Sequence, residues 1–443
     1  MKPLRPTADP RADAAVVLAR AITGSARSTD LLLEFERAYP AGRERDAALL
    51  HELVLGVLRH RAACQTFVTP LLRKPLDDSP PPVREVLLCM AYQAVFLERV
   101  PAHARVSASV AAVRRVAGDR YAGFVNAVGR GIERAVEAGD PLAPLPPEVR
   151  HSIPRHLLRR IAAVHGGPPD EDVLARMSDR ATLALRANRA AATPDEVTAA
   201  LVAAGLGARR SAIAPDGVVV EHGRLASAVA AGVVPRLAVP QDEASQLVVA
   251  ALAPQPGERV LDLCAGGGVK TSQIEAATGA AATAVDLDGA RLERASDLCR
   301  RMGLPSPEAI ASDAASLPAE MDGHADAVLL DAPCTGIGTA RRRPEVRYVR
   351  REPDYTRAAE VQVALLRRAC SLPRPGGRLV YAVCSFAPEE GPGVVARVLA
   401  ERTDVAVEPA PIPGPWLRRD GTVLTLPWRD GCDGFFVACL RRL

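Results

Sequence analysis

ERVLDLCAGGGVK, residues 258–270, decides the fold of the second half of this 443-residue chain. An apolar strand runs into three consecutive glycines and then into residues that can begin a helix. Glycines let the backbone approach a ligand closely, and a helix N-terminus offers free N–H groups. The motif is therefore typical of a nucleotide-type site, although such a loop alone is a weak signal and needs support from its neighbours.

Short strands alternate with helices around this loop, from residue 241 to residue 443. The pattern predicts strands at ERVLDLCA, AATAVDLD, EAIASDA, ADAVLLDAP, GRLVYAVCS and GFFVACLRR. It predicts helices at QDEASQLVVAAL, GARLERASDLCRRMG and TRAAEVQVALLRRAC. Strands separated by helices form a parallel sheet with helices on both faces, so we expect a Rossmann-like α/β domain over 241–443.

The chain before residue 241 shows two other patterns. Residues 8–140 place apolar side chains at three- and four-residue spacing, which predicts an all-helical domain. The proline-rich segment PLAPLPPEV, residues 141–149, is typical of a linker. Residues 150–240 combine helix-like IPRHLLRRIAAV and DEVTAALVAAG with strand-like TLALRAN and GVVVEH, which predicts a small α/β connector.

Composition excludes several classes of protein. The net charge of +4 permits a polyanionic partner without requiring one. Nine cysteines with no C-x-x-C pair favour reduced thiols over a disulfide framework or a zinc site, so we expect no metal. The N-terminal MKPLRPTADPRADA lacks the apolar segment of a signal peptide, and no apolar run is long enough to span a membrane. We therefore expect a cytoplasmic protein without a membrane partner, and take it to be a monomer.

Aspartates follow successive predicted strands and strengthen the cofactor interpretation. Asp286 lies 20 residues after Gly266 at the tip of the second strand, where an acid can bind two ribose hydroxyls. Asp313 follows the third strand, where an adenine contact would come from. Each aspartate alone could be a helix cap. The NAD fingerprint G-x-G-x-x-G is absent, and S-adenosylmethionine carries no phosphate, so the loop favours methyl transfer over hydride transfer.

Two cysteines stand at the ends of the fourth and fifth strands. VLLDAPCTGIG contains Asp331 and Cys334, and LVYAVCSF contains Cys384. Ligands of open α/β sheets bind beyond the carboxyl ends of the strands. Carbon 5 of cytosine attacks a methyl group only after a thiolate adds to carbon 6, with an acid near N3 and later loss of the carbon 5 proton. The three side chains suit these tasks.

The remaining cysteines have no such setting. Free cysteine is among the most buried residue types. At Cys264 we expect packing together with backbone contact to the cofactor. Structural thiols are expected at Cys64, Cys89, Cys299, Cys370, Cys432 and Cys439.

DAPCTGIGTARRRPEVRY, YAVCS and QDEASQL…GERVLDLCA resemble the RsmB family, also called Sun or Fmu, of bacterial 16S ribosomal RNA (cytosine-5)-methyltransferases. RDAALLHELVLGVLRH, AYQAVFLERVPAHARV and FVNAV resemble the family's NusB-like RNA-binding domain. LALRAN with DEVTAALVAAG resembles its middle segment, and DGFFVACLRR its closing strand. The resemblance thus covers nearly the whole chain.

The resemblance implies a role for each motif. Cys384 takes the position of the nucleophile, and Cys334 that of the cysteine that helps release the product. Asp331 also touches the target base. The cofactor would be held by Cys264, Ala265, Gly266, Gly267, Gly268, Val269, Lys270, Asp286, Asp313 and Asp331.

The glycine loop departs from the family's C-A-A-P-G-G-K at two positions. Gly267 replaces a proline, which should loosen the turn because proline fixes φ. Val269 replaces a glycine, and valine disfavours positive φ, so we expect the loop to bend differently, and the sequence leaves open how the two changes affect cofactor affinity. The Gly-Pro-Gly at 391–393 is expected to delay the start of the helix after YAVCS, and Pro240 stands where an aliphatic residue is usual.

An arginine run follows Cys334. Arginine binds phosphates and stacks on bases, so we expect this run to contact RNA, although a charge run can also be a solvated face. A cytosine modified at carbon 5 must be single-stranded or flipped out. The run comprises Arg341, Arg342, Arg343, Arg347, Arg350 and Arg351.

We therefore expect an S-adenosylmethionine-dependent enzyme that methylates carbon 5 of a cytosine in 16S ribosomal RNA through a covalent cysteine adduct at carbon 6. One alternative is a transfer RNA methyltransferase with the same chemistry, which the NusB-like domain disfavours only by analogy. A second is a non-enzymatic RNA-binding protein with a degenerate cofactor loop. The altered loop supports it, whereas intact Cys334, Cys384 and Asp331 oppose it.

Overall fold

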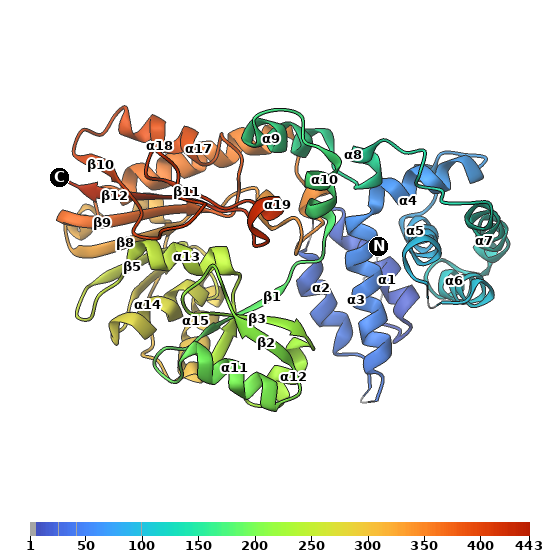
Figure 1. The fold of residues 1–443 in the computed structure, drawn as a ribbon, viewed down its shortest axis with the longest axis horizontal. Helices are drawn as coiled ribbons and strands as arrows, with labels where there is room; N and C mark the ends of the chain where they lie inside the picture. The colour runs from blue at the N-terminus through green and yellow to red at the C-terminus, as the bar shows by residue number, and fades with distance from the viewer. Residues whose placement is uncertain (1–5, 25, 41, 99) are drawn as a thin grey trace. The chain divides into compact units, whose positions relative to one another are not determined.

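The computed structural model describes residues 6–443 except 25, 41 and 99, so the first five residues of the polar N-terminal segment lie outside the described residues. The chain divides into two compact units, whose elements are drawn in Figure 1. Unit 1 comprises Met1–Asp179 and Ala340–Arg351, and unit 2 comprises Arg180–Thr339 and Glu352–Leu443. No helix within the described part of the chain is long and apolar enough to cross a membrane.

Unit 1 is built from helices, as the apolar spacing predicts. Asp9 caps the first helix and Pro10 occupies its first turn, which suits the residue that lacks an N–H donor. The helices α3 (Glu44–Arg59) and α4 (Arg61–Val68) follow each other directly and are separated at His60, where the backbone leaves helical geometry. The helices are α1 (Pro10–Ala21), α2 (Ser28–Glu36), α3 (Glu44–Arg59), α4 (Arg61–Val68), α5 (Pro81–Phe96), α6 (Ala102–Ala117), α7 (Ala122–Glu137), α8 (Pro147–Arg150), α9 (Arg155–His165), α10 (Glu171–Ser178) and α16 (Val346–Val349).

The proline-rich segment after α7 is ordered and packed, unlike the linker that its composition predicts. Leu142 is buried and belongs to the apolar core of unit 1. Pro147 begins α8, the short helix that follows the turn. Proline here sets the start of a helix, where its fixed φ is favourable.

The predicted connector, residues 150–240, divides between the two units, because its helices α9 and α10 belong to unit 1. The part of the connector in unit 2 forms a four-stranded antiparallel sheet in the order β2-β3-β1-β4. Thr193 and Glu196 cap its first helix reciprocally. The sequence predicts β1, β3 and this helix, but not β2 or β4, which are short. The elements are β1 (Leu183–Ala187), β2 (Gly207–Arg210), β3 (Gly217–His222), β4 (Ala238–Pro240), α11 (Pro194–Ala203) and α12 (Leu225–Ala230).

The large sheet of unit 2 has the order β10-β12-β9-β8-β5-β6-β7, with β11 paired to β12. The five strands from β7 to β9 are parallel, as predicted, whereas the C-terminal strand β12 runs antiparallel between β9 and β10. The sheet is therefore mixed. Its strands are β5 (Val260–Leu263), β6 (Thr283–Asp286), β7 (Glu308–Ala311), β8 (Ala325–Asp331), β9 (Pro373–Val383), β10 (Val405–Glu408), β11 (Val423–Leu424) and β12 (Phe436–Arg442).

Helices cover both faces of this sheet, because successive strand residues point to opposite faces. Leu329 and Val380 pack with α13 and α14, whereas Leu330 and Tyr381 pack with α17 and α18. Figure 1 shows these helix pairs on opposite sides of the sheet. The helices of this part are α13 (Glu243–Leu252), α14 (Val269–Thr278), α15 (Gly289–Met302), α17 (Glu352–Ala369), α18 (Pro392–Leu399) and α19 (Pro427–Asp430).

Candidate active site

The strand order creates a switch point between β5 and β8. From β5 the chain continues to β6 and β7 on one side, and then returns to β8 on the other side of β5. Loops that leave the carboxyl ends of β5 and β8 therefore diverge, which opens a crevice at the edge where ligands of α/β sheets bind. The pairing of Leu263 with Leu330 and with Val285 places Cys264 beside both Asp331 and Asp286 at this edge.

The two predicted thiols meet at the same edge. β8 and β9 are parallel neighbours, and Asp331 pairs with Ala382, so the segments that carry Cys334 and Cys384 leave the sheet side by side at the same edge. The Sγ atoms lie 3.2 Å apart, and both residues are half-buried. The hydrogen bond to Cys384, burial, and the charges of Cys384 and Glu390 raise the pKa of the Cys334 thiol. Cys334 therefore keeps its proton and can donate it toward Cys384.

Lys270 and Asp331 form an ion pair beside the thiols. The Lys270 Nζ lies 2.7 Å from the Asp331 carboxylate and 5.5 Å from the centre of the Phe435 ring. Burial alone would lower the pKa of Lys270, but the charge and hydrogen bond of Asp331 outweigh it, and the charge of Cys384 adds to them, so the pKa is raised. The ammonium group is thus a fixed positive charge next to the nucleophile position.

The positive φ angles of the glycine loop fall on neither of the two substituted residues, Gly267 and Val269. Cys264, Gly266 and Gly268 have φ of 61°, 59° and 78°. Val269 is the first residue of α14, where helical φ suits any L-residue, so the expectation that this valine must bend the loop differently is wrong. A Cβ on Gly268 would lie 2.5 Å from the Cβ of Ala295, so only glycine fits there.

The predicted cofactor aspartates differ in their surroundings. Asp286 is buried, and its carboxylate accepts the backbone N–H groups of Gly266 and Asp288, each at 2.9 Å. Asp313 is exposed and accepts the N–H of Ala315, as a cap of the short helix that follows. Sequence reasoning missed Leu287, whose side chain is 76% exposed directly after Asp286. An exposed apolar side chain beside an acid suits an adenosine-type ligand.

Arg186 of the connector supports the glycine loop, and sequence reasoning missed it. Its buried guanidinium donates to Ser272 Oγ at 2.7 Å and to Gln241 Oε1 at 2.6 Å, which ties β1 to the first turns of α14. Burial lowers the pKa of Arg186 to about 10, so it stays charged at neutral pH. The LALRAN segment carries it, but nothing local indicates that the arginine points inward.

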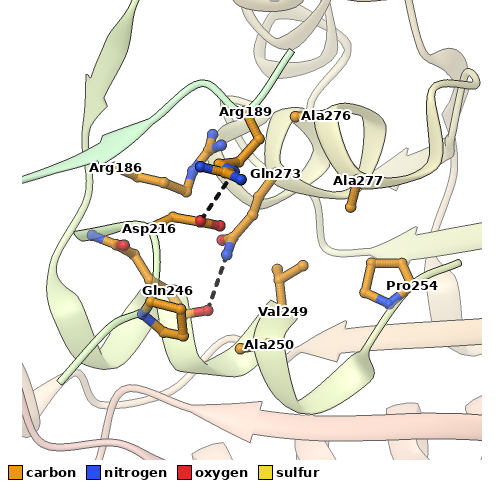
Figure 2. Close-up of a pocket in the computed structure, with 11 residues that line it drawn as sticks. Arg186, Arg189, Asp216, Gln246, Val249, Ala250, Pro254, Gln273, Ala276 and Ala277 are labelled. Atoms are coloured by element: carbon orange, nitrogen blue, oxygen red, sulfur yellow. Dashed lines mark hydrogen bonds and ion pairs between the residues drawn. The ribbon is translucent and has the colours of Figure 1, made fainter. Parts of the chain in front are cut away.

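A pocket of about 120 Å³ lies along this arginine, between the connector and α13 and α14 (Figure 2). Figure 2 shows the Arg189–Asp216 ion pair, at 3.5 Å, on its wall. Binding pockets for drug-sized ligands are typically ~300 Å³ or larger. None of the candidate catalytic residues lines it, so it is distinct from the crevice at the strand ends.

The arginine run does not form the exposed surface that the sequence predicts. Arg347 is fully buried in unit 1, where its guanidinium donates to the backbone carbonyls of Arg59, Met177 and His151. Arg341 is also buried, and Arg342, Arg343 and Arg350 are half-buried, with Arg351 exposed. Arg347 therefore contributes to the stability of unit 1 and leaves no donor group facing solvent.

The burial of the other cysteines agrees with the expectation of structural thiols at six positions. Cys264 is half-buried at the loop, like the two candidate catalytic thiols. The six thiols predicted to be structural are all buried: Cys64, Cys89, Cys299, Cys370, Cys432 and Cys439.

Similarity to known proteins covers all parts of the chain. Residues 249–441 match the family described as 16S rRNA methyltransferase RsmB/F, 10–134 match the NusB family, and 153–225 match the ferredoxin-like domain of RsmF/B-like methyltransferases. The ribosomal RNA small subunit methyltransferase B of Klebsiella pneumoniae is 33% identical over 405 residues, which is 90% of each chain. The chain belongs to the RsmB/F family. The Vibrio cholerae member is 33% identical over 96% of this chain and 97% of its own.

Solved structures share the fold of this RsmB/F family member. The crystal structure of PH0851 has a TM-score of 0.82 at 23% identity and covers 98% of this chain and 99% of that one. NSun6 from Pyrococcus horikoshii, solved with SFG, has a TM-score of 0.57 at 19% identity over 65% of this chain and 98% of its own. The helical, connector and α/β parts thus belong to a fold that the RsmB/F family shares with more distant proteins.

Proposed function

We propose that this protein methylates carbon 5 of a cytosine in 16S ribosomal RNA, with S-adenosylmethionine as methyl donor and Cys384 as covalent nucleophile. The observation that carries the proposal is the contact of two thiols, 3.2 Å apart, beside the Lys270–Asp331 ion pair. Two adjacent thiols and a carboxylate at one edge of the sheet suit covalent catalysis, in which a nucleophile first bonds to the base and later leaves it. Relatives named ribosomal RNA small subunit methyltransferase B support the substrate class.

The loop and strand ends fit S-adenosylmethionine. The cofactor would lie over residues 264–270, with Asp286 toward its ribose, Leu287 against its adenine and Asp313 at the adenine edge. Gly267 is exposed and Gly268 is packed against Ala295, so the loop is open on one side and fixed on the other. The related NSun6 structure carries SFG, an analogue of this cofactor. The cofactor supplies the methyl group. Side chains of the protein activate the cytosine, orient it and release the product.

The side chains divide the reaction between them. Cys384 forms a bond from its thiolate to carbon 6 of the cytosine, which makes carbon 5 nucleophilic. Asp331 lies where it can hydrogen-bond the base near N3, and Lys270 fixes its orientation. After methylation, the carbon 5 proton passes to Cys334 while the Cys334 proton passes to the leaving sulfur of Cys384, 3.2 Å away. The bond between Cys384 and carbon 6 then breaks and its electrons stay on sulfur, while the electrons of the broken C–H bond re-form the double bond between carbons 5 and 6.

RNA contact is proposed for Arg342 and Arg343 rather than for their buried neighbours. Both side chains are half-buried, and Arg343 lies 3.6 Å from the carboxylate of Glu345. Partial pairing leaves a guanidinium able to bind a phosphate, since it has five donors in a planar fork. The NusB-like helical part is proposed to bind RNA as well.

The test is methyl transfer from labelled S-adenosylmethionine to unmodified small-subunit ribosomal RNA and, in parallel, to transfer RNA. The product nucleoside is identified by mass spectrometry. Label as 5-methylcytosine in ribosomal RNA alone is the expected result. Label in transfer RNA alone would replace the substrate and keep the chemistry. No label in either RNA, together with no heat of cofactor binding, would favour an RNA-binding protein without activity.

A further inference from the structure

Glu390 is a fully buried carboxylate that touches neither thiol directly. It lies seven residues after the end of β9, in the Cys384 loop, residues 384–391. Burying a carboxylate is costly unless donors satisfy its oxygens. The side chain must therefore have partners strong enough to hold it, and these partners define what it does.

The partners of Glu390 lie on both catalytic loops. Its Oε1 accepts the backbone N–H of Thr335 at 2.7 Å, and its Oε2 accepts the Thr335 hydroxyl and the Ser385 hydroxyl, the latter at 2.6 Å. Thr335 directly follows Cys334, and Ser385 directly follows Cys384. One carboxylate thus joins the residue after each thiol.

Gln362 of α17 completes the arrangement from the other side. Its Nε2 donates to Glu390 Oε1 at 3.2 Å and to the carbonyl of Pro333 at 3.0 Å. Hydrogen bonds therefore fix Pro333 and Thr335, the residues on either side of Cys334 in the chain. The Tyr381 hydroxyl donates its one hydrogen toward the backbone carbonyl of Glu390, at 2.5 Å, and lies 3.2 Å from Gln362 Oε1, which anchors the same cluster to β9.

The donors around Glu390 satisfy all the acceptor sites of its carboxylate. A carboxylate has about four lone-pair sites, and Glu390 accepts from one backbone N–H, two hydroxyls and one amide. Glu390, Gln362 and Ser385 are each 0% exposed and Thr335 is 2% exposed. Fully satisfied buried networks are rigid, because any displacement leaves a polar group unpaired.

We propose that Glu390 is a positioning residue that holds the Cys334 and Cys384 loops together, so that the two thiols act on one cytosine. The inference rests on the proposed function, because it assigns both thiols to one reaction. Without the carboxylate, the contacts that remain between the described parts of the two loops include the Gly338 N–H to Cys384 carbonyl bond, at 3.1 Å, and the contact of the two thiols. The thiols would then separate while the cofactor loop, which Glu390 does not touch, stays formed.

The spacing of the thiols can be measured without any RNA. A bifunctional thiol reagent such as dibromobimane joins two neighbouring thiolates and releases two bromide ions. Mass spectrometry of the digested full-length protein then shows the peptide in which Cys334 and Cys384 are joined. We expect Glu390→Ala to slow this cross-link at least tenfold, and Glu390→Gln to restore much of the rate. A glutamine keeps one acceptor oxygen, and its amide can donate to the two hydroxyl oxygens.

The matched control is Glu360→Ala. Glu360 lies on α17 and pairs with Arg397 at 2.9 Å on the surface, so its loss should leave the cross-linking rate unchanged. Calorimetry with S-adenosylmethionine should give wild-type affinity for all variants, which also shows that unit 2 is folded. If Glu390→Ala does not fold, Ser385→Ala removes one of the hydrogen bonds to Glu390, together with the bond that the Ser385 hydroxyl accepts from the Ala387 N–H, and should slow the cross-link severalfold. Wild-type rates in every folded variant of the cluster would overturn the proposal.

A measurement of adduct formation and turnover with RNA tests the proposed function separately from the role of Glu390. With RNA that contains 5-fluorocytosine, carbon 5 cannot lose its substituent, so the covalent adduct persists and can be counted on a denaturing gel. We expect Glu390→Ala to lower kcat and the rate of adduct formation at least tenfold with little change in KM for the cofactor. A wild-type protein that forms no adduct would overturn the proposed function, whereas the order of cross-linking rates would still decide the role of Glu390.

Discussion

At the residue scale, the two thiols have different surroundings although they touch. Cys334 is held at a raised pKa by its bond to Cys384, by burial and by nearby negative charge. Cys384 lies within electrostatic reach of the Lys270 ammonium group. A cation favours a thiolate, whereas burial and anions favour a thiol. In the proposed mechanism, the first setting suits Cys334 as proton donor and the second suits Cys384 as nucleophile.

Replacing Cys384 with alanine should abolish methyl transfer, because Cys384 is the proposed nucleophile that adds to carbon 6. We expect activity to fall by at least about 10³-fold and no covalent RNA adduct to form. The measurement is labelled methyl transfer combined with a denaturing gel of labelled RNA. Cofactor affinity should not change, and an adduct in this variant would assign the nucleophile to another residue.

Replacing Cys334 with alanine should have a different effect. The nucleophile remains and the base is methylated, but release of the product lacks its helper. We expect the covalent adduct to accumulate during the reaction with unmodified RNA, visible as a slow-migrating band on a denaturing gel. A variant that turns over at the wild-type rate, without any such band, would contradict the assigned role.

Asp262 makes the stability of unit 2 depend on pH. Its carboxylate is fully buried, and burial raises its pKa to about 7, although a hydrogen bond from Thr271 opposes the shift. Because the folded protein holds this proton more tightly than the unfolded chain, the stabilisation is complete below pH ~4 and is lost as pH rises toward 7. The loss is on the order of 4 kcal/mol, from a shift of roughly three pKa units.

The check is the unfolding free energy of the wild type and of Asp262→Asn between pH 4 and pH 8. Trp416 and Trp428 both lie in unit 2 and report its unfolding by fluorescence. We expect the asparagine variant to lose most of the downward slope. Asp297→Asn changes a surface carboxylate paired with Arg300 and should keep the wild-type slope. Equal slopes for wild type and Asp262→Asn would show that this carboxylate does not titrate in the range.

At the scale of elements, the site is produced by strand ends that are adjacent in space. The parallel pairs β5–β6, β5–β8 and β8–β9 bring the glycine loop, Asp286, Asp331 and both thiols to one edge. Helix α14 then begins at the last glycine of the loop and directs its N-terminus toward the same edge. Small changes where this helix meets α15 should therefore affect cofactor binding.

Gly268→Ala is expected to weaken cofactor binding at least tenfold. The new Cβ would lie 2.5 Å from Ala295 at a φ of 78°, so either the loop or α15 must move. Gly279→Ala is the matched control, because it has a φ of 70° at the other end of α14 with no atom near its Cβ. It should cost about 1 kcal/mol in stability and keep cofactor affinity. Calorimetry that finds the same affinity for both variants would contradict the steric argument.

At the scale of the whole molecule, unit 1 is assembled from two distant parts of the sequence. Residues 340–351 follow the Cys334 segment in the chain, yet they pack within the helical unit. Glu345 accepts hydrogen bonds from Ser28, and Arg347 donates to carbonyls near the ends of α3 and α10. The helical unit therefore requires a segment that lies in the sequence of the methyltransferase part.

Arg347→Met should destabilise unit 1 by about 3 kcal/mol or more, because several buried carbonyls lose their donor. Hydrogen exchange at the amides of α9 and α10 is the appropriate measurement, since both tryptophans lie in unit 2. Arg114→Met changes an exposed pair with Asp119 and should shift exchange by less than about 1 kcal/mol. Unchanged protection in Arg347→Met would mean that water replaces the guanidinium at no cost.

The sequence by itself determined which segments form strands, the order of the motifs that follow them, and the chemistry of the residues in those motifs. The apolar runs of β5, β8 and β9 are buried on both faces, so they read as strands without ambiguity, and the motifs at their ends follow directly. The separation of Cys334 and Cys384 from the six buried cysteines was also predictable, because these two follow strands, as Cys264 does, and stand beside polar loop residues.

Only the tertiary structure decided which side chains face one another. Thr335, Gln362, Ser385 and Glu390 are far apart or unremarkable in the sequence, and a buried carboxylate is recognised only from the donors that surround it. The sequence predicts Arg347 to be a surface cation, because charged residues are rarely buried. Its burial is recognised only from the backbone carbonyls that accept hydrogen bonds from its guanidinium. Local patterns record what a residue prefers, whereas packing between distant segments determines what it contacts.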